Sequence, residues 1–266
     1  MKLSLTEEQT MIKDMACKFA NSVLEPAAKA LDRGDDKAAE RALFLHNLQQ
    51  LAELGFMGLN VKSEYGGSDA GVVAFSLAIT QVARVCASTA VTMSVTNMVG
   101  EVIQAIASEE QKQRYLPQLC SGNYAAGSFC LSEAEVGSDP AGMKTSAVLD
   151  NNEWVLNGTK MWISSAEYAG IFVVCAVTDP MAAKGKGISC FLVEAGTPGL
   201  IIGKAEEKMG QHGSATNTVI FDDCRVPKSA LMGELNDGFR IALSELSGGR
   251  IGIGSLALGI GQSAMD

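Results

Sequence analysis

The feature that most constrains the fold is a change in the spacing of apolar residues after Gly122. Before this point apolar residues recur at helical spacing, and after it they alternate with polar residues in short runs bounded by Gly, Pro, Asn and Asp. Helical spacing returns at Asp237. We therefore predict an N-terminal all-α domain (residues 1–124), a middle antiparallel β-barrel domain (125–236) and the start of a C-terminal helical bundle (237–266).

Start and stop signals divide the first domain into helices. Capping boxes open helices at Thr6 and at Ser108. The stretch between residues 72 and 107 carries only two charges, Arg84 and Glu101, which is typical of helices buried on most sides. We predict a helix from Thr6 to near Pro26, helices at 38–54 and 108–122, and a pair of helices within 72–107.

The middle domain is predicted from short runs of apolar residues. An Asp-Asn-Asn turn at residues 150–152 joins two of these runs, which is typical of a β-hairpin. The predicted strands are 147–149, 154–156, 171–177, 188–193, 200–202 and 218–221, about six antiparallel strands in all.

The last stretch combines helical spacing with many glycines. Glycine is a weak helix former, so this segment has little intrinsic stability as a helix. We therefore expect it to depend on packing against other elements.

Bulk properties exclude several classes of protein. A formal net charge of -9 at pH 7 opposes binding to nucleic acid, which attracts clustered Lys and Arg. The seven cysteines have no paired spacing and the two histidines no ligand-like spacing, so we predict buried free thiols and no metal site. No run of about 18 apolar residues occurs, and residues 1–30 lack a secretory pattern. We expect no membrane span, and a location in a bacterial cytoplasm or, after processing, a mitochondrial matrix.

Several motifs occur together in one order along the chain. A Cys-Leu-Ser-Glu run leads three residues later to Gly-Ser-Asp, and an Asn-Gly-Thr-Lys run leads to Trp-Ile-Ser. With these motifs the whole chain resembles the acyl-CoA dehydrogenase family, and it looks most like the short-chain and branched-chain members. The matching stretches are Glu53–Phe56, Glu64–Gly67, Cys130–Asp139, Leu156–Ser164 and Gly249–Ile253.

The resemblance implies a reaction, a cofactor and partners. The family uses FAD to oxidise an acyl-CoA thioester, removing a proton from Cα while a hydride passes from Cβ to flavin N5. The implied partners are the acyl-CoA substrate, an electron-transfer flavoprotein as acceptor, and further copies of the full-length chain in a homotetramer.

The resemblance also implies which residues bind these molecules. Ser132 is the implied hydrogen-bond donor to the pyrimidine end of the flavin, Ser164 its partner at N5, and Trp162 a flat surface against the ring. The implied cofactor-binding residues are Phe129, Leu131, Ser132, Gly137, Ser138, Trp162, Ile163 and Ser164, and the implied substrate-binding residues are Ser138, Ser247 and Arg250. Family members usually have an Asp at the position of Ser247.

The implied catalytic base is missing from this sequence. Most members place a Glu in later C-terminal helices, and an isovaleryl-type minority places it directly before the arginine that Arg250 matches. Here that residue is Gly249, which cannot accept a proton. We therefore expect the base beyond Asp266, and we expect the 266-residue chain to bind FAD weakly without dehydrogenase turnover.

Two other functions stay open. Oxidases and monooxygenases with the same scaffold let dioxygen reach the reduced flavin, and a non-catalytic remnant of the family could keep the first two domains without a base. Taken singly, Ser132 is more often a loop hydroxyl and Trp162 more often a core residue. Their joint occurrence with the Gly-Arg run, in one order, favours the flavin interpretation.

Overall fold

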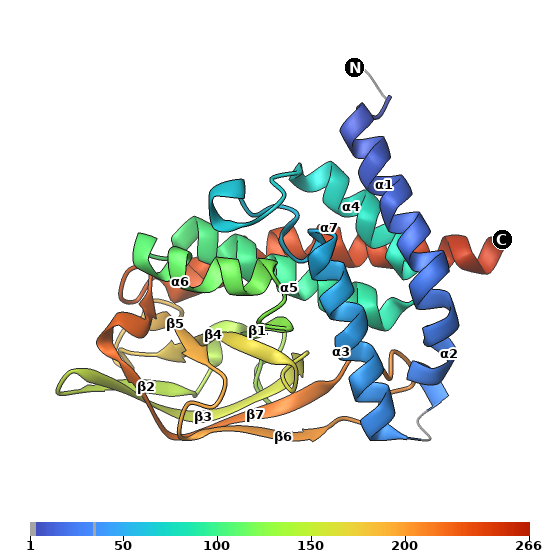
Figure 1. Ribbon diagram of the computed structural model, residues 1–266. Helices are drawn as coiled ribbons and strands as arrows, with labels where there is room; N and C mark the ends of the chain where they lie inside the picture. The colour runs from blue at the N-terminus through green and yellow to red at the C-terminus, as the bar shows by residue number, and fades with distance from the viewer. Residues whose placement is uncertain (1–3, 34–35) are drawn as a thin grey trace.

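The computed structural model describes residues 4–33 and 36–266. Its helices are α1 (Glu7–Phe19), α2 (Glu25–Arg33), α3 (Lys37–Glu53), α4 (Gly71–Ala83), α5 (Ala87–Ile106), α6 (Glu109–Cys120) and α7 (Gly238–Met265). A layer of helices lies on one side of a curved sheet, and α7 runs back through that layer to the C-terminus (Figure 1). The predicted order of helices, then strands, then helix is confirmed.

Most local helix signals are confirmed. The hydroxyls of Thr6 and Ser108 each accept a hydrogen bond from the backbone N–H of a glutamine three residues later. The side-chain oxygen of that glutamine accepts the backbone N–H of Thr6 or Ser108 in turn, so both capping boxes form. Helix α3 ends before Gly55, which has a φ of 77° in the left-handed region that glycine favours. The apolar stretch forms α4 and α5 as the predicted pair.

The prediction that the first helix ends near Pro26 is wrong. The chain continues from α1 through a π-helical turn, Ala20–Leu24, into α2. The backbone N–H of Glu25 donates to the carbonyl of Ala20, five residues earlier. This wider turn just before Pro26 accommodates a ring that would clash with the preceding carbonyls of a regular α-helix.

The strands form one eight-stranded sheet. They pair in the order β6-β7-β3-β2-β4-β5-β8, with β1 beside β4. The predicted hairpin is formed by β2 and β3, and Asn151 in its turn has a φ of 57°. The strands are β1 (Ala126–Cys130), β2 (Ser146–Asp150), β3 (Glu153–Ser164), β4 (Ala169–Val177), β5 (Ile188–Glu194), β6 (Leu200–Ala205), β7 (Thr216–Pro227) and β8 (Leu231–Met232).

The prediction that every strand pair is antiparallel is wrong at β4. Both β1 and β2 pair with β4 in parallel, with Phe129 opposite Val173 and Ser146 opposite Val177. Strands β1 and β8 are also not among the predicted strands. β1 is buried on both faces, so it lacks the alternation from which the other strands are predicted.

The curved sheet separates two apolar clusters. On β4, Val173 and Cys175 face a cluster shared with α5, α6 and α7, whereas Phe172 and Val174 face a cluster enclosed by β3, β5 and β7. Since neighbouring residues of a strand point to opposite faces, β4 contributes to both clusters. One face of the sheet therefore carries the helical layer, and the other curves around its own core.

Glycines of α7 let it approach its neighbours closely. A Cβ on Gly259 would lie 2.4 Å from the carbonyl oxygen of Thr80 in α4, and one on Gly252 would lie 2.1 Å from Ser94 Oγ in α5. The expectation that this glycine-rich helix depends on packing agrees with these contacts.

Among the described residues, no helix is both long and apolar enough to cross a membrane.

Candidate functional site

Two segments far apart in sequence meet at the end of β1. The backbone N–H of Met161 in β3 donates to the carbonyl of Ser132, at 2.9 Å. The hydroxyl of Ser128 in β1 donates to the carbonyl of Ser164, at 2.8 Å. These bonds place Ser132 beside the stretch that holds Trp162 and Ser164, so the structure brings the three principal predicted residues into one region.

A β-bulge presents the indole of Trp162 to solvent. The register between β3 and β7 shifts between Lys160 and Ile163, and Trp162 has a φ of 63°. A left-handed backbone costs a non-glycine residue roughly 1–2 kcal/mol. The bulge therefore holds this conformation against its strain, and it leaves Trp162 60% exposed while Ile163 beside it is 2% exposed.

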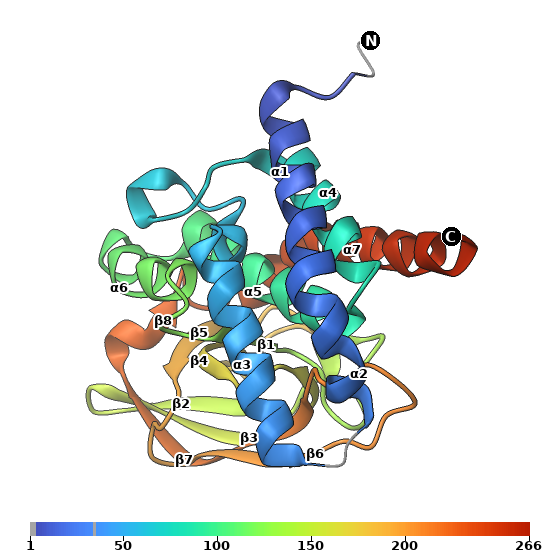
Figure 2. The ribbon, with the colours of Figure 1, turned by 45° about the vertical axis from the view of Figure 1, so that its right-hand side comes forward.

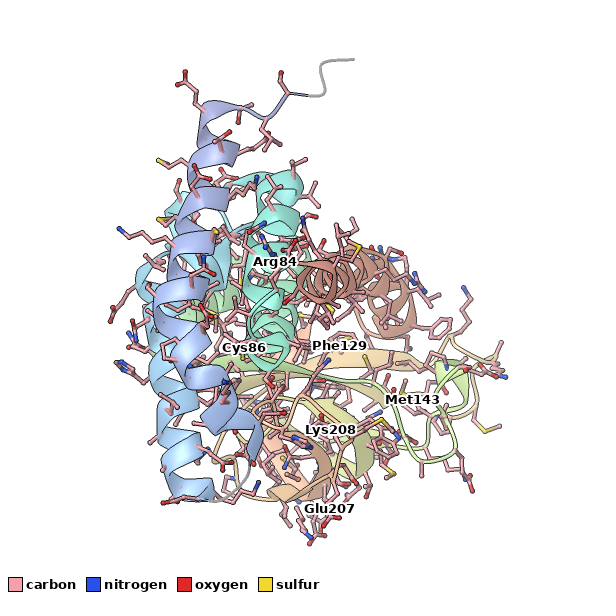
Figure 3. All side chains as sticks on the ribbon, turned by 90° about the vertical axis from the view of Figure 1, so that its right-hand side faces the viewer. Arg84, Cys86, Phe129, Met143, Glu207 and Lys208 are labelled. Carbon is pink, nitrogen blue, oxygen red and sulfur yellow. The ribbon has the colours of Figure 1, made fainter. Side chains whose placement is uncertain are left out.

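The predicted cofactor residues divide into three groups by burial. Trp162, Gly137 and Ser138 are exposed, and a Cβ on Gly137 would meet nothing within 4 Å. Phe129, Ser132 and Ser164 are half-buried, and Phe129 lies where α7 passes over the sheet (Figure 3). Leu131 and Ile163 are buried in the two apolar clusters, so they support the site from behind.

The two predicted substrate residues belong to helix α7 rather than to the strands and loops that hold this group. Ser247 and Arg250 are both exposed and three residues apart, so they share one side of the helix. The hydroxyl of Ser247 donates to the carbonyl of Leu243, at 3.3 Å. No hydrogen bond among the described residues joins either side chain to the strands.

Two carboxyl groups that the sequence did not suggest as a site meet between α5 and α7. Burial, and after it the charge of Glu101, together raise the pKa of Glu245 to about 8. Burial also raises the pKa of Glu101, although Asn60 donates a hydrogen bond to it at 2.6 Å. At neutral pH Glu245 is therefore largely protonated, and it is a proton donor rather than a base. The available signal was Glu101 itself, one of two charges in an apolar stretch.

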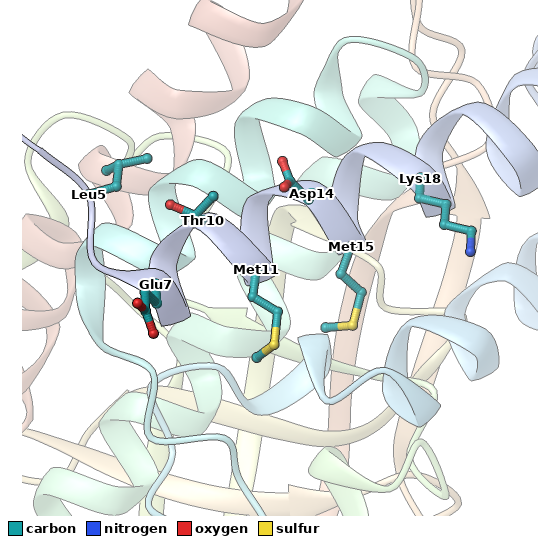
Figure 4. Close-up of a pocket in the computed structure, with 7 residues that line it drawn as sticks. All are labelled: Leu5, Glu7, Thr10, Met11, Asp14, Met15 and Lys18. Atoms are coloured by element: carbon teal, nitrogen blue, oxygen red, sulfur yellow. The ribbon is translucent and has the colours of Figure 1, made fainter.

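Two hollows among the described residues are lined by residues other than those of the predicted site. One, of about 670 Å³, is an open depression along α1 that includes Thr10, Met11 and Met15 (Figure 4). A second, of about 520 Å³, is lined by residues of α3 and β6, and its charged groups are largely paired. Figure 2 shows one end of α3 beside β6. There Arg41 bonds the carbonyl of Glu167 and covers the Tyr168 ring, which indicates a structural contact.

The exposed and half-buried residues of the site fit a flat heteroaromatic ring with a polar edge. Within residues 4–33 and 36–266, no hydrogen bond uses the side-chain hydroxyl of Ser132 or of Ser164. The indole of Trp162 offers an uncovered aromatic surface, and Gly137 leaves open space beside its backbone. An isoalloxazine ring, apolar on its faces and polar along its pyrimidine edge, matches these features.

Two sequence profiles match the chain. The profile described as acyl-CoA dehydrogenase, N-terminal domain, covers residues 6–123, and the profile for the middle domain covers residues 128–224. The acryloyl-CoA reductase (NADH) of Anaerotignum propionicum is 42% identical, over 100% of this chain and 66% of that protein. The human mitochondrial short-chain specific acyl-CoA dehydrogenase is 41% identical, over 99% of this chain and 62% of that protein.

Solved structures give the same result. Butyryl-CoA dehydrogenase from Megasphaera elsdenii superposes with a TM-score of 0.92 at 35% identity, over 99% of this chain and 68% of that one. A structure from work on the electron transferring flavoprotein of Acidaminococcus fermentans has a TM-score of 0.92 at 39% identity, over 99% and 68%. An acyl-CoA dehydrogenase complexed with FAD from Bacillus anthracis has a TM-score of 0.87 at 32% identity, over 96% and 42%.

The chain thus spans about two thirds or less of the length of these relatives, whereas the matches cover nearly all of the chain itself. Both the sequence profiles and the superpositions follow the order of helices and strands seen in the structure. This chain belongs to the acyl-CoA dehydrogenase family.

Proposed function

We propose that this chain carries the flavin-facing surface of an FAD-dependent dehydrogenase that introduces an α,β double bond into a short- or branched-chain acyl-CoA. The observation that supports it is the meeting of Ser132, Trp162 and Ser164 at the β3 bulge, with their aromatic and hydroxyl groups free of partners in the described residues. Flavin-dependent relatives, including one solved with FAD, support the choice of cofactor.

Each residue of this surface has a proposed role. When bound, the flavin supplies a hydride acceptor at N5. Ser132 donates a hydrogen bond to the pyrimidine edge, where negative charge develops during reduction, and Ser164 bonds near N5. Trp162 covers the ring and excludes water from it. Gly137 lets the cofactor approach the backbone closely.

The substrate and the partners belong to the same proposal. Ser138, Ser247 and Arg250 would contact the acyl-CoA, with Arg250 supplying a fixed positive charge near the thioester. An electron-transfer flavoprotein is the proposed acceptor, and the full-length protein is proposed to be a homo-oligomer. The proposed location is a bacterial cytoplasm or a mitochondrial matrix.

We expect the 266-residue chain to bind FAD without turning over butyryl-CoA. The reason is that Gly249 stands where the resemblance would place a base in this helix, and Glu245, one turn earlier, keeps its proton at neutral pH because its pKa is raised to about 8. Adding FAD, butyryl-CoA and a dye acceptor to the purified chain tests this. Dye reduction at family-like rates would contradict it.

FAD binding itself tests the proposed site. We expect Trp162→Ala to weaken FAD binding by about tenfold, because an aromatic contact contributes roughly 0.5–1.5 kcal/mol beyond the area it buries. Val148→Ala is the matched control, since Val148 is an equally exposed apolar residue of the same sheet, on β2. Equal affinity of both variants, or no FAD binding by the wild-type chain, would overturn the proposed site.

The reverse reaction, reduction of an enoyl-CoA, is a second candidate function, and it is favoured by the 42% identity with an acryloyl-CoA reductase. An enzyme of that kind would deliver hydride from reduced flavin to an enoyl-CoA. Reduced FAD bound to the full-length protein would then be reoxidised by acryloyl-CoA in the absence of air. A lack of such reoxidation, together with reduction by butyryl-CoA, would favour the dehydrogenase.

A further inference from the structure

The most deeply buried ion pair of the described residues lies behind the proposed flavin site. Lys160 in β3 is fully buried, and its Nζ lies 2.9 Å from Glu133 Oε1, whose side chain is 8% exposed. Removing two charges from water is costly, and apolar residues of similar size often stabilise a protein as well or better. Stability alone is therefore a weak explanation for this pair.

The carboxylate of Glu133 closes the loop between β1 and β2. One oxygen accepts the backbone N–H of Lys144 at 2.7 Å, and the other accepts that of Thr145 at 3.0 Å. The backbone of Glu133 also exchanges hydrogen bonds with Val136, at 3.2 and 3.1 Å. Glu133 thus ties both ends of the segment 134–143, which contains Gly137 and Ser138.

The ammonium of Lys160 connects that loop to β1 and to the bulge. Besides Glu133, it donates to the carbonyl of Leu131 at 3.1 Å and lies 3.7 Å from Met143 Sδ. Leu131 directly precedes Ser132, and Lys160 is the residue at which the register of β3 begins to shift before Trp162. One buried charge is therefore bonded at three points around the site.

We propose that Lys160 and Glu133 are positioning residues of the flavin site, holding the segment 132–143 in a fixed relation to the bulge that presents Trp162. The inference rests on the proposed function. Neither side chain is itself proposed to touch the cofactor. Lys160 acts through the backbone next to Ser132, and Glu133 acts through the N–H groups that close the loop.

The charge state of Glu133 agrees with this role. Burial on its own would raise the pKa of Glu133, but the charge of Lys160 and the hydrogen bonds to the carboxylate outweigh burial and leave the pKa below its usual value. The carboxylate is therefore ionised at neutral pH, when it can accept all of its bonds at once.

Hydrogen exchange without cofactor tests the positioning directly. Lys160→Met keeps an unbranched side chain one atom shorter than lysine and removes the charge. We expect amides of the segment 134–143 to exchange about tenfold faster in this variant, while those in the centre of β7 keep their wild-type rates. Lys184→Met is the matched control: it removes the partner of Asp139, a residue of the same loop, in an ion pair whose side chains are both 64% exposed. Its exchange should match the wild type.

FAD titration provides the second measurement. We expect folded Lys160→Met to bind FAD about tenfold more weakly, with a shifted visible absorption band that reports a changed flavin environment. If that variant does not fold, Glu133→Asp keeps the charge and withdraws the carboxylate by one methylene, and it should loosen the same segment. Unchanged exchange in the folded variant would overturn the positioning inference, whereas absence of FAD binding by the wild-type chain would overturn the proposed function instead.

Discussion

Replacing Glu245 by Gln should remove a large part of the loss of stability at alkaline pH. Glu245 lies between α5 and α7, one of its oxygens is buried without a hydrogen-bond partner, and its pKa is raised from 4.5 to about 8 by burial and by Glu101. The folded chain therefore keeps a proton that the unfolded chain releases. The contribution of Glu245 to the free energy of unfolding therefore falls as the pH rises from about 4.5, and this contribution is lost completely above about pH 8.

The size of the effect follows from the pKa. At about 1.4 kcal/mol per unit, the interval from 4.5 to about 8 corresponds to roughly 5 kcal/mol, of which roughly 3 kcal/mol falls between pH 6 and pH 9. Gln is neutral at both pH values. The variant should therefore gain roughly 3 kcal/mol relative to the wild type when the pH is raised from 6 to 9.

Urea unfolding followed by circular dichroism at both pH values measures this difference. Glu207→Gln is the control, because the side chain of Glu207 is 93% exposed and its loss should shift stability equally at the two pH values. An equal difference between the Glu245 variant and the wild type at pH 6 and pH 9 would contradict the raised pKa of Glu245.

Two further predictions concern packing. Gly259→Ala should destabilise the chain by roughly 1–3 kcal/mol, because a Cβ would lie 2.4 Å from the backbone oxygen of Thr80. Gly261→Ala should instead stabilise it by roughly 0.5–1 kcal/mol, because Gly261 is an exposed helix residue with open space around it. Thermal unfolding of the two variants measures whether the two changes have opposite signs. Leu48→Ala should cost roughly 2–5 kcal/mol in urea unfolding because Leu48 is fully buried in α3, and a cost below about 1 kcal/mol would contradict the described core.

Features that depend on a few neighbouring residues were predictable from the sequence. The capping boxes at Thr6 and Ser108, the stop at Gly55 and the hairpin turn at Asn151 each follow from the chemistry of one short segment. The family was equally accessible, because its motifs are contiguous runs. The predicted domain boundaries at residues 124 and 236 stay predictions.

Features that depend on distant partners were not predictable. The parallel pairing of β1 with β4 joins Phe129 to Val173, and no local pattern specifies that register. The π turn before Pro26 is one of several ways in which a chain can accommodate proline. The raised pKa of Glu245 exists only because α7 packs on α5, which the spacing of apolar residues in either helix does not reveal.

The same limit applies to the site. The motifs identified Ser132 and Trp162 as residues of one surface, but not the left-handed bulge that turns the indole outward. They also did not reveal that Lys160 is fully buried behind that surface, because the sequence shows it only as one residue of the Asn-Gly-Thr-Lys run. Both features depend on residues distant in the chain: the bulge is a register shift in the pairing of β3 with β7, and Lys160 bonds the carbonyl of Leu131.

Hydroxyl-radical footprinting of Trp162 with and without FAD, read by mass spectrometry, measures whether the cofactor covers the surface at the β3 bulge. Trp162 is 60% exposed and should be oxidised readily in the free chain, and FAD should protect it strongly. Met209, which is fully exposed on the segment after β6, should be oxidised at the same rate in both samples. Oxidation of Trp162 that is unchanged by saturating FAD would contradict a flavin site at this residue.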